Sequence, residues 1–184
     1  MDNTQILLLG AGAYLITKVA QYNVDSIRYD YKCEKPLYDF FHQVIPNLKR
    51  YELFIDLVPI LLGVAVFYLY MYDNLDEQLI RDAIINYAIL MVVRAVFFSV
   101  TILPSPICSK RFKTKAIGGC HDCIFSAHAT LMLLLAYALY KHNPQYQTAL
   151  IIYCILGSLL IIGTRSHYSI DVITAYAVVY SLLK

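Results

Sequence analysis

The sequence predicts an all-α, polytopic membrane protein that folds as a bundle of six transmembrane helices. Hydrophobic residues make up 59% of the 184 residues and charged residues only 15%, which is too apolar for an ordinary soluble fold. Six segments also approach the roughly 20 mostly apolar residues that a helix needs to cross a bilayer. The length suits one domain, so we expect residues 1–184 to form a single transmembrane domain.

The six segments follow from the apolar runs of the chain. The first is the weakest, because Gly10 and Gly12 interrupt it and Lys18 lies inside it. The last two are short, and only a few residues separate them. In chain order we predict helices at Thr4–Gln21, Tyr51–Tyr72, Leu79–Leu103, Ile124–Tyr140, Tyr146–Thr164 and Tyr168–Leu183.

Alternate crossing of the bilayer by these helices sorts the connecting segments between two faces. The face reached at the end of the first helix, here called face X, receives residues 23–50, 104–123 and 165–167. The opposite face, face Y, receives residues 73–78 and 141–145. Every stretch that is rich in chemically active side chains falls on face X, so we expect a functional site there.

Charge and cysteine content exclude other classes of protein. The formal net charge of +2 is too small to indicate a nucleic-acid partner, and no RNA-binding motif is present. Five cysteines at irregular spacings do not form a disulfide framework. We therefore expect no nucleic-acid partner, while a homo-oligomer stays open.

Two histidines open helices on face X. In RSHYSIDVITAY, His167 and Asp171 are spaced i, i+4 and share one helix face. Asp171 can accept a hydrogen bond from one ring nitrogen of His167 and leave the other nitrogen as a nucleophile or base. The alternative is a hydrogen bond that serves only the structure. His128 opens the fourth helix, and two such helix N-termini attract a phosphoryl group. Ser126 diverges from His128 on a helix, so we expect it to cap the helix or to donate to a phosphate oxygen.

Arg94 lies deep in the third predicted helix, where an arginine must face the bundle interior, a partner or water. A structural ion pair with Asp56 of the second helix is one interpretation. We favour the other, in which the guanidinium extends towards face X and holds phosphate.

The stretch CHDC, residues 120–123, has the spacing of a metal or redox motif. Zinc could bind its two cysteines with His121 or His128, but no second ligand pair with suitable spacing is present. A redox pair would require a soluble βαβ unit. We therefore predict no metal and no cofactor, and a disulfide within this loop or with Cys108 stays open if face X is oxidising.

Taken together, four motifs resemble the sphingomyelin synthase family, whose members are membrane relatives of the phosphatidic acid phosphatase type 2 superfamily. CHDCIFSAHAT (residues 120–130) and HYSIDVITAY (residues 167–176) resemble its paired motifs. KPLYDFF, from Lys35, resembles its PLPD motif, and RAVFFSVTILPSP, from Arg94, resembles its Arg-to-TLPxP segment. The resemblance covers about residues 35–184, which we expect to form the catalytic core.

By motif position, the resemblance implies that His128 is one catalytic histidine. His167 and Asp171 match the second catalytic histidine and the aspartate that supports it, and Asp122 falls on an acidic position associated with the same site. The residues expected to bind substrate or phosphate are Asp122, Ser126 and Arg94.

The resemblance also implies a reaction. A phosphocholine-type headgroup moves from a glycerophospholipid such as phosphatidylcholine to ceramide, which gives sphingomyelin and diacylglycerol without a metal. His167 carries the headgroup as a phosphohistidine, and His128 serves as the acid and then the base.

The chain departs from the family at several positions. Ala127 stands where the family has glycine, and the shorter loop at residues 106–120 lacks an acidic residue of the animal enzymes, so choline, ethanolamine and inositol phosphate all stay open as headgroups. Ile161 replaces an arginine of the wider superfamily, which favours the synthases over a lipid phosphate phosphatase that uses water as acceptor. A non-catalytic membrane protein ranks last, because every catalytic residue type is present.

Basic loops on face X would make that face cytosolic under the positive-inside rule. The resemblance instead implies a lumenal or exoplasmic active site. We follow the resemblance, since anionic lipid headgroups give an independent reason for basic loops. We expect a multi-pass protein of the Golgi, another endomembrane or the plasma membrane.

Overall fold

Six long helices make up most of the described residues, and each lies on one of the six predicted segments. The computed structural model describes residues 2–28, 36–104, 106 and 123–184. The long helices are α1 (Asn3–Arg28), α3 (Leu57–Tyr72), α4 (Glu77–Val100), α5 (Ala127–His142), α6 (Gln147–Gly163) and α7 (Ser169–Leu182). The shorter ones are α2 (Phe40–Val44) and the 3-10 helices η1 (Lys49–Ile55) and η3 (Pro144–Tyr146). The predicted all-α class is confirmed.

Polar caps, and not the ends of the apolar runs, set where several helices begin. Ser126 Oγ accepts a hydrogen bond from the backbone N–H of Ala129 at 3.3 Å, so α5 begins at Ala127, three residues after the predicted start. Asp76 Oδ1 accepts from the N–H of Gln78 at 2.9 Å, so α4 begins two residues before its predicted start.

The first two predicted segments differ most from the structure. α1 continues to Arg28, seven residues beyond the predicted end at Gln21. Polar side chains end an apolar run, but they do not end the backbone hydrogen bonding of a helix. The second segment starts with η1, and the chain is α-helical only from Leu57.

Three helices of the described chain are long and apolar enough to cross a bilayer, where the sequence predicts six crossings. They cover Lys49–Tyr72, Glu77–Val100 and Pro144–Gly163. α5 has 16 residues and α7 has 14, which gives lengths of about 24 and 21 Å at a rise of about 1.5 Å per residue. Both are shorter than the roughly 30 Å hydrocarbon core of a bilayer.

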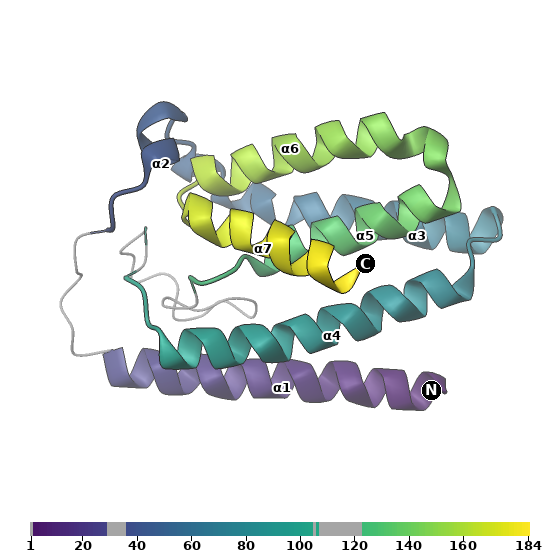
Figure 1. Cartoon of the computed structure of the whole chain (residues 1–184), viewed down its shortest axis with the longest axis horizontal. Helices are drawn as coiled ribbons and strands as arrows, with labels where there is room; N and C mark the ends of the chain where they lie inside the picture. The colour runs from purple at the N-terminus through teal and green to yellow at the C-terminus, as the bar shows by residue number, and fades with distance from the viewer. Residues whose placement is uncertain (1, 29–35, 105, 107–122) are drawn as a thin grey trace.

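The helices form a bundle around α5 (Figure 1). α5 contacts α3, α4, α6 and α7, while α1 lies along the outer side of α4. The α3–α4 and α5–α6 connections lie at one end of the bundle, on the right in Figure 1. α2, the α6–α7 connection and the start of α5 lie towards the other end, as the sorting into faces Y and X predicts.

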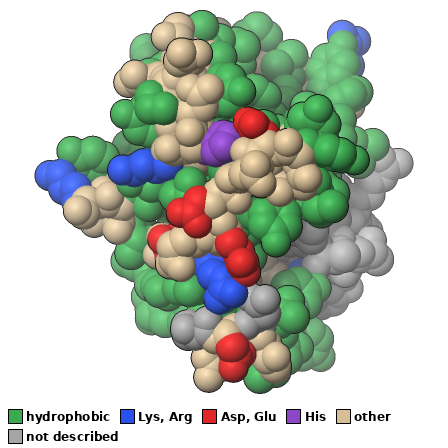
Figure 2. All heavy atoms as spheres, turned by 90° about the vertical axis from the view of Figure 1, so that its right-hand side faces the viewer, with side chains coloured by type: hydrophobic (Ala, Val, Ile, Leu, Met, Phe, Trp, Pro, Cys, Tyr) green, Lys and Arg blue, Asp and Glu red, His purple; other side chains and the backbone are tan. Residues whose placement is uncertain are grey.

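The outside of the bundle is apolar along the helices and polar at face Y. Phe67, Ile155 and Ile173 are each more than half exposed, as expected for helices that contact lipid. Figure 2 looks onto face Y, where charged and polar side chains lie among hydrophobic ones. There Asp73 Oδ2 lies 3.1 Å from His142 Nε2, which links the ends of α3 and α5.

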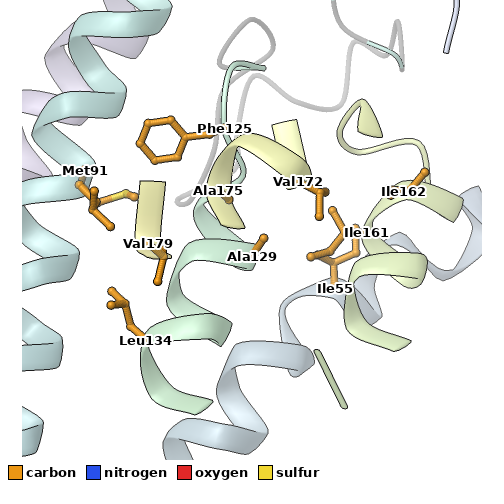
Figure 3. Close-up of a cluster of buried hydrophobic side chains, with 11 residues drawn as sticks. Ile55, Met91, Phe125, Ala129, Leu134, Ile161, Ile162, Val172, Ala175 and Val179 are labelled. Atoms are coloured by element: carbon orange, nitrogen blue, oxygen red, sulfur yellow. The ribbon is translucent and has the colours of Figure 1, made fainter. Parts of the chain in front are cut away.

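A buried hydrophobic cluster lies next to the helix starts of face X (Figure 3). It brings together side chains from η1, α4, α5, α6 and α7, among them Ala129 and Val172, and Phe125 from the chain just before α5. Ile161 belongs to this cluster and is fully buried. An arginine at that position of this bundle would be buried among apolar groups, at a cost in desolvation of its charge.

Candidate active site

His167 lies just before α7, and Asp171 lies in the first turn of that helix. His167 Nδ1 is 3.2 Å from Asp171 Oδ2, and the two side chains are 7% and 0% exposed. A neutral imidazole that donates its Nδ1–H to this carboxylate keeps a lone pair on Nε2. The structure therefore places the two residues together in the arrangement that a histidine nucleophile requires.

Asp171 is also the link between the starts of α5 and α7. Its Oδ2 accepts a second hydrogen bond from the backbone N–H of Tyr168 at 3.0 Å, which holds the carboxylate against the helix start. Its backbone carbonyl accepts from the N–H of Ser126 at 3.1 Å. Because Ser126 caps α5, this bond fixes the two helix N-termini next to each other.

His128, in the first turn of α5, faces His167. The centres of the two rings are 6.4 Å apart, and the ring planes meet at 61°. His128 Nε2 lies 2.8 Å from Asp56 Oδ1, at the start of α3, and the Asp56 side chain is 57% exposed. Each histidine is thus paired with a carboxylate through one ring nitrogen, and the other nitrogen of His128, Nδ1, is buried with no hydrogen-bond partner among the described residues.

Arg94 is 2% exposed and holds the chain that leads into α5. Its Nε donates to the carbonyl oxygen of Phe125 at 2.7 Å, and its guanidinium carbon lies 5.4 Å from the centre of the Phe98 ring. Asp56, considered above as its ion-pair partner, contacts His128. The structure thus gives Arg94 a contact one residue before Ser126, and its role towards phosphate stays a prediction.

Two other predicted binding residues have different outcomes. Ser126 caps α5 through its Oγ, as one of its two predicted roles requires, and is fully buried. Asp122 lies outside the described residues, together with Cys120 and His121, so its role in binding substrate stays a prediction.

The chain around α2 holds the loop that carries His167. Asp39 Oδ2 accepts hydrogen bonds from the backbone N–H of Ser169 at 2.6 Å and from its Oγ–H at 2.8 Å. His42 Nε2 lies 3.1 Å from the carbonyl oxygen of His167. Arg165 Nη2 returns two bonds, to the carbonyl oxygens of His42 at 2.6 Å and Ile45 at 2.9 Å.

Three further bonds extend this contact on both sides of His167. The N–H of Leu48 donates to the Gly163 carbonyl at 2.8 Å, and the N–H of Leu37 donates to Tyr168 Oη at 3.0 Å. Tyr168 Oη in turn donates to the Pro104 carbonyl at 2.8 Å. We call residues 37–48 the α2 brace, because they fix the backbone on either side of His167.

The ionisation of the α2 brace follows from its contacts. Burial acts to raise the pKa of the Asp39 carboxyl, but the hydrogen bonds from Ser169 and from the His42 N–H outweigh it and lower the pKa. Burial is the main reason that the pKa of His42 is lowered, against the attraction of Asp39. Asp39 is therefore held ionised, and His42 is held neutral.

One group in the described chain has the composition of a metal site. Ligand atoms of Cys123, His167 and Asp171 all lie within 4.8 Å of one another, and the three residues are buried. The zinc site considered from the sequence used a different set, in which Cys123 joined Cys120 and a histidine of the same loop or helix.

Four residues that contact the catalytic candidates or their loop were not predicted as site residues: Asp56, Asp39, His42 and Arg165. Asp56 lies 72 residues before His128, so no local spacing pairs them. Asp39 lies in the KPLYDFF motif, and this position was the only feature of the sequence that could have indicated a role for it at the site. Arg165 was visible only as a basic residue beside His167, in a left-handed backbone conformation (φ 63°) that the sequence does not indicate.

The comparisons with known proteins concern the C-terminal part of the chain. Residues 119–183 match the family model described as PAP2 superfamily C-terminal. Two relatives, each named phosphatidylinositol:ceramide inositolphosphotransferase, come from Oryza sativa subsp. indica and subsp. japonica. Each is 34% identical over 67 residues, which cover 35% of this chain and 21% of the relative, so the match spans about a fifth of the length of these proteins.

The matched region holds α5, α6 and α7, and with them His128, His167 and Asp171. The resemblance that the motifs indicate is thereby confirmed at the level of the superfamily. The part of the chain that brings these three residues together is similar to the C-terminal region of the PAP2 superfamily.

Proposed function

We propose that this protein is a lipid phosphotransferase that moves a phosphate-containing headgroup from a glycerophospholipid to ceramide. The observation that carries the proposal is the pair of carboxylate-bound histidines, His167 with Asp171 and His128 with Asp56, whose rings are 6.4 Å apart at one end of the bundle. Two imidazoles at this separation can both act on one phosphoryl group. One attacks the phosphorus as the nucleophile, and the other serves as the acid and then the base.

In the first step, His167 is the nucleophile. Its Nδ1–H donates to Asp171, so the Nε2 lone pair attacks the phosphorus of the donor lipid. The bond from phosphorus to the diacylglycerol oxygen breaks, and a protonated His128 gives that oxygen its proton. The products of this step are diacylglycerol and a headgroup phosphate bound to His167.

In the second step, ceramide is the acceptor. His128, now neutral and held through Nε2 by Asp56, takes the proton of the primary hydroxyl of ceramide. The hydroxyl oxygen attacks phosphorus, the phosphorus–nitrogen bond breaks, and His167 is regenerated. The helix dipoles at the paired starts of α5 and α7 stabilise the phosphoryl charge in both steps.

Two headgroups follow from two different observations. The paired motifs resemble sphingomyelin synthases, which makes phosphatidylcholine the donor and sphingomyelin the product. The matched relatives are named as ceramide inositolphosphotransferases, which favours phosphatidylinositol as the donor. The chemistry at His167 and His128 is the same for both donors.

The six long helices are proposed to cross the membrane as a unit, including the short α5 and α7. α5 is surrounded by α3, α4, α6 and α7, so its ends need not reach the bilayer surface by themselves. In this arrangement the two histidines lie at the level of the headgroups, on the lumenal or exoplasmic side.

The proposal is tested with purified full-length protein and a panel of headgroup-labelled donors: phosphatidylcholine, phosphatidylethanolamine, phosphatidylinositol and phosphatidic acid. We expect ceramide-dependent transfer of one headgroup and its loss in His167→Gln. The product identifies the headgroup.

Release of phosphate from phosphatidic acid without any need for ceramide would instead identify a lipid phosphate phosphatase. Full transfer by His167→Gln would contradict the proposed mechanism. His142→Gln serves as the matched control, since His142 also contacts an aspartate but lies on face Y.

A further inference from the structure

We propose that Cys123, His167 and Asp171 form a binding site for a thiophilic divalent cation of the zinc type. The cation is not a cofactor of the proposed reaction. It occupies the groups that the reaction needs, so it acts as an inhibitor.

The three residues supply the ligand types that zinc prefers: a thiolate, an imidazole and a carboxylate. They come from two separate segments, the chain that leads into α5 and the start of α7. One ligand atom from each lies within 4.8 Å of the other two, and their residues are 2%, 6% and 0% exposed. Three protein ligands leave a fourth position for water or for a lipid oxygen.

A buried acceptor gives a second reason to place a cation here. Asp171 is fully buried, and its Oδ1 has no hydrogen-bond partner among the described residues. A carboxylate oxygen without a donor is costly in a buried position. A cation held by both oxygens of the Asp171 carboxylate would remove that cost, and Oδ2 would also keep its bond from the Tyr168 N–H.

The separation of the two hardest ligands already fits zinc. His167 Nδ1 and Asp171 Oδ2 are 3.2 Å apart. Zinc bonds of about 2.0–2.1 Å to nitrogen and oxygen place two ligands of a tetrahedron about 3.3–3.4 Å apart. The zinc–sulfur bond is longer, about 2.3 Å, so sulfur and nitrogen on one tetrahedral zinc lie about 3.6 Å apart. The Cys123 Sγ lies within 4.8 Å of the other two ligand atoms, so it completes the set by an approach of about 1.2 Å or less.

Binding exchanges protons for the metal. The Cys123 thiol loses its proton to solvent, the proton on His167 Nδ1 moves to Nε2, and metal–ligand bonds replace the hydrogen bond between His167 and Asp171. Affinity should therefore increase with pH. If the proposed function is correct, His167 then lacks its orienting carboxylate and cannot attack phosphorus, so transfer stops.

The binding test does not depend on catalysis. Cadmium, which has the same ligand preferences as zinc for thiolates, is titrated into the full-length variant C33S/C108S/C120S/C154S, where Cys123 is the remaining cysteine. We expect the ultraviolet absorption of a cadmium–thiolate bond to saturate at one equivalent and to disappear with a chelator. Adding C123S should abolish the signal, and His167→Gln should weaken binding at least tenfold, whereas His142→Gln should not change it.

Absence of the thiolate absorption, or its full retention in His167→Gln, would overturn the proposed site. If the four-serine variant does not fold, the same titration is made on the natural sequence and on C123S alone, and equal spectra would overturn the site. Transfer measured with zinc forms a separate arm. Metal binding without any transfer activity would contradict the proposed function and leave the metal site standing, whereas zinc-insensitive transfer with normal binding would contradict the inhibition.

Discussion

At the scale of residues, the two histidines have similar contacts that suit the different tasks proposed for them. A carboxylate contacts one nitrogen of each ring, through Nδ1 in His167 and through Nε2 in His128. Asp171, whose carboxylate contacts His167, is fully buried, while the side chain of Asp56, which contacts His128, is 57% exposed. In the proposed mechanism, a buried partner fixes the His167 ring for attack, and an exposed partner suits the His128 ring, which gains and loses a proton in each cycle.

Asp56→Asn should therefore lower kcat by about a hundredfold with a much smaller effect on KM, because the asparagine cannot stabilise the protonated form of His128. Steady-state transfer assays over the donor concentration measure both constants. Asp73→Asn is the matched control: it removes a similarly exposed carboxylate from a histidine contact on face Y and should leave kcat unchanged. Equal effects of the two substitutions would show that Asp56 acts only on the fold.

At the scale of elements, α6 approaches α5 and α3 closely at one glycine. A Cβ atom on Gly157 would lie 2.6 Å from Met132 Sδ and 2.8 Å from Val58 Cγ1. Gly63, in α3, has space, since its nearest neighbour would be Leu135 Cδ1 at 3.9 Å. The contact of α6 with the centre of the bundle thus depends on the absence of a side chain at Gly157.

Gly157→Ala should destabilise the protein by about 1–3 kcal/mol through overpacking. Gly63→Ala should be neutral or stabilising by up to about 1 kcal/mol, because alanine favours the helix and fits the space. Thermal unfolding in detergent compares the two variants. A Gly157→Ala protein as stable as Gly63→Ala would contradict the packing described here.

The α2 brace is the element through which pH should act on the site. The pKa of His42 is lowered in the folded protein, mainly by burial, so the unfolded chain binds a proton at a higher pH than the folded one. The stability that the neutral ring contributes is complete above its ordinary pKa of about 6.5 and is lost as the pH falls towards the lower folded value.

His42→Gln keeps an N–H donor for the His167 carbonyl but does not titrate. When the pH is lowered from about 7.5 to about 5, we expect the temperature of the unfolding midpoint to fall further in the natural protein than in His42→Gln. In His142→Gln, a histidine substitution on face Y, the unfolding midpoint should depend on pH as it does in the natural protein. The same loss in His42→Gln as in the natural protein would exclude His42 as the titrating group.

At the scale of the whole molecule, the order of helices along the chain places the candidate site at one end of the bundle. The starts of α5 and α7 share one end of the bundle, and the α3–α4 and α5–α6 connections share the other (Figure 1). An acceptor site for N-glycosylation inserted at residues 106–120 should be modified in cells, while one inserted at residues 143–146 should not. The reverse pattern would place the active site on the cytosolic side, as the charge of the loops alone suggests.

Much of this architecture could be predicted from the sequence because it depends on local patterns. Apolar runs located all six long helices, and the i, i+4 spacing located the contact of His167 with Asp171. Contacts between distant segments could not be predicted in this way. Asp56 reaches His128 across 72 residues, and the α2 brace reaches the His167 loop across more than 110 residues, so both depend on how the bundle packs.

Helix ends were predicted less well, for a physical reason. A hydropathy pattern reports burial in lipid or protein, whereas caps and 3-10 turns depend on individual hydrogen bonds such as that from Ala129 to Ser126. The apolar residues of the short α5 and α7 face neighbouring helices as well as the outside, so for these two helices the crossing of the membrane stays a prediction.

The most direct test of the proposed function is to trap the headgroup on the protein. Purified full-length protein is incubated with phosphorus-labelled phosphatidylcholine or phosphatidylinositol in the absence of ceramide, and the labelled peptide is identified. We predict an acid-labile label on His167 that is released onto ceramide when ceramide is added, and that is absent in His167→Gln. A protein that transfers the headgroup while forming no label, or that is still labelled as His167→Gln, would contradict the phosphohistidine at His167.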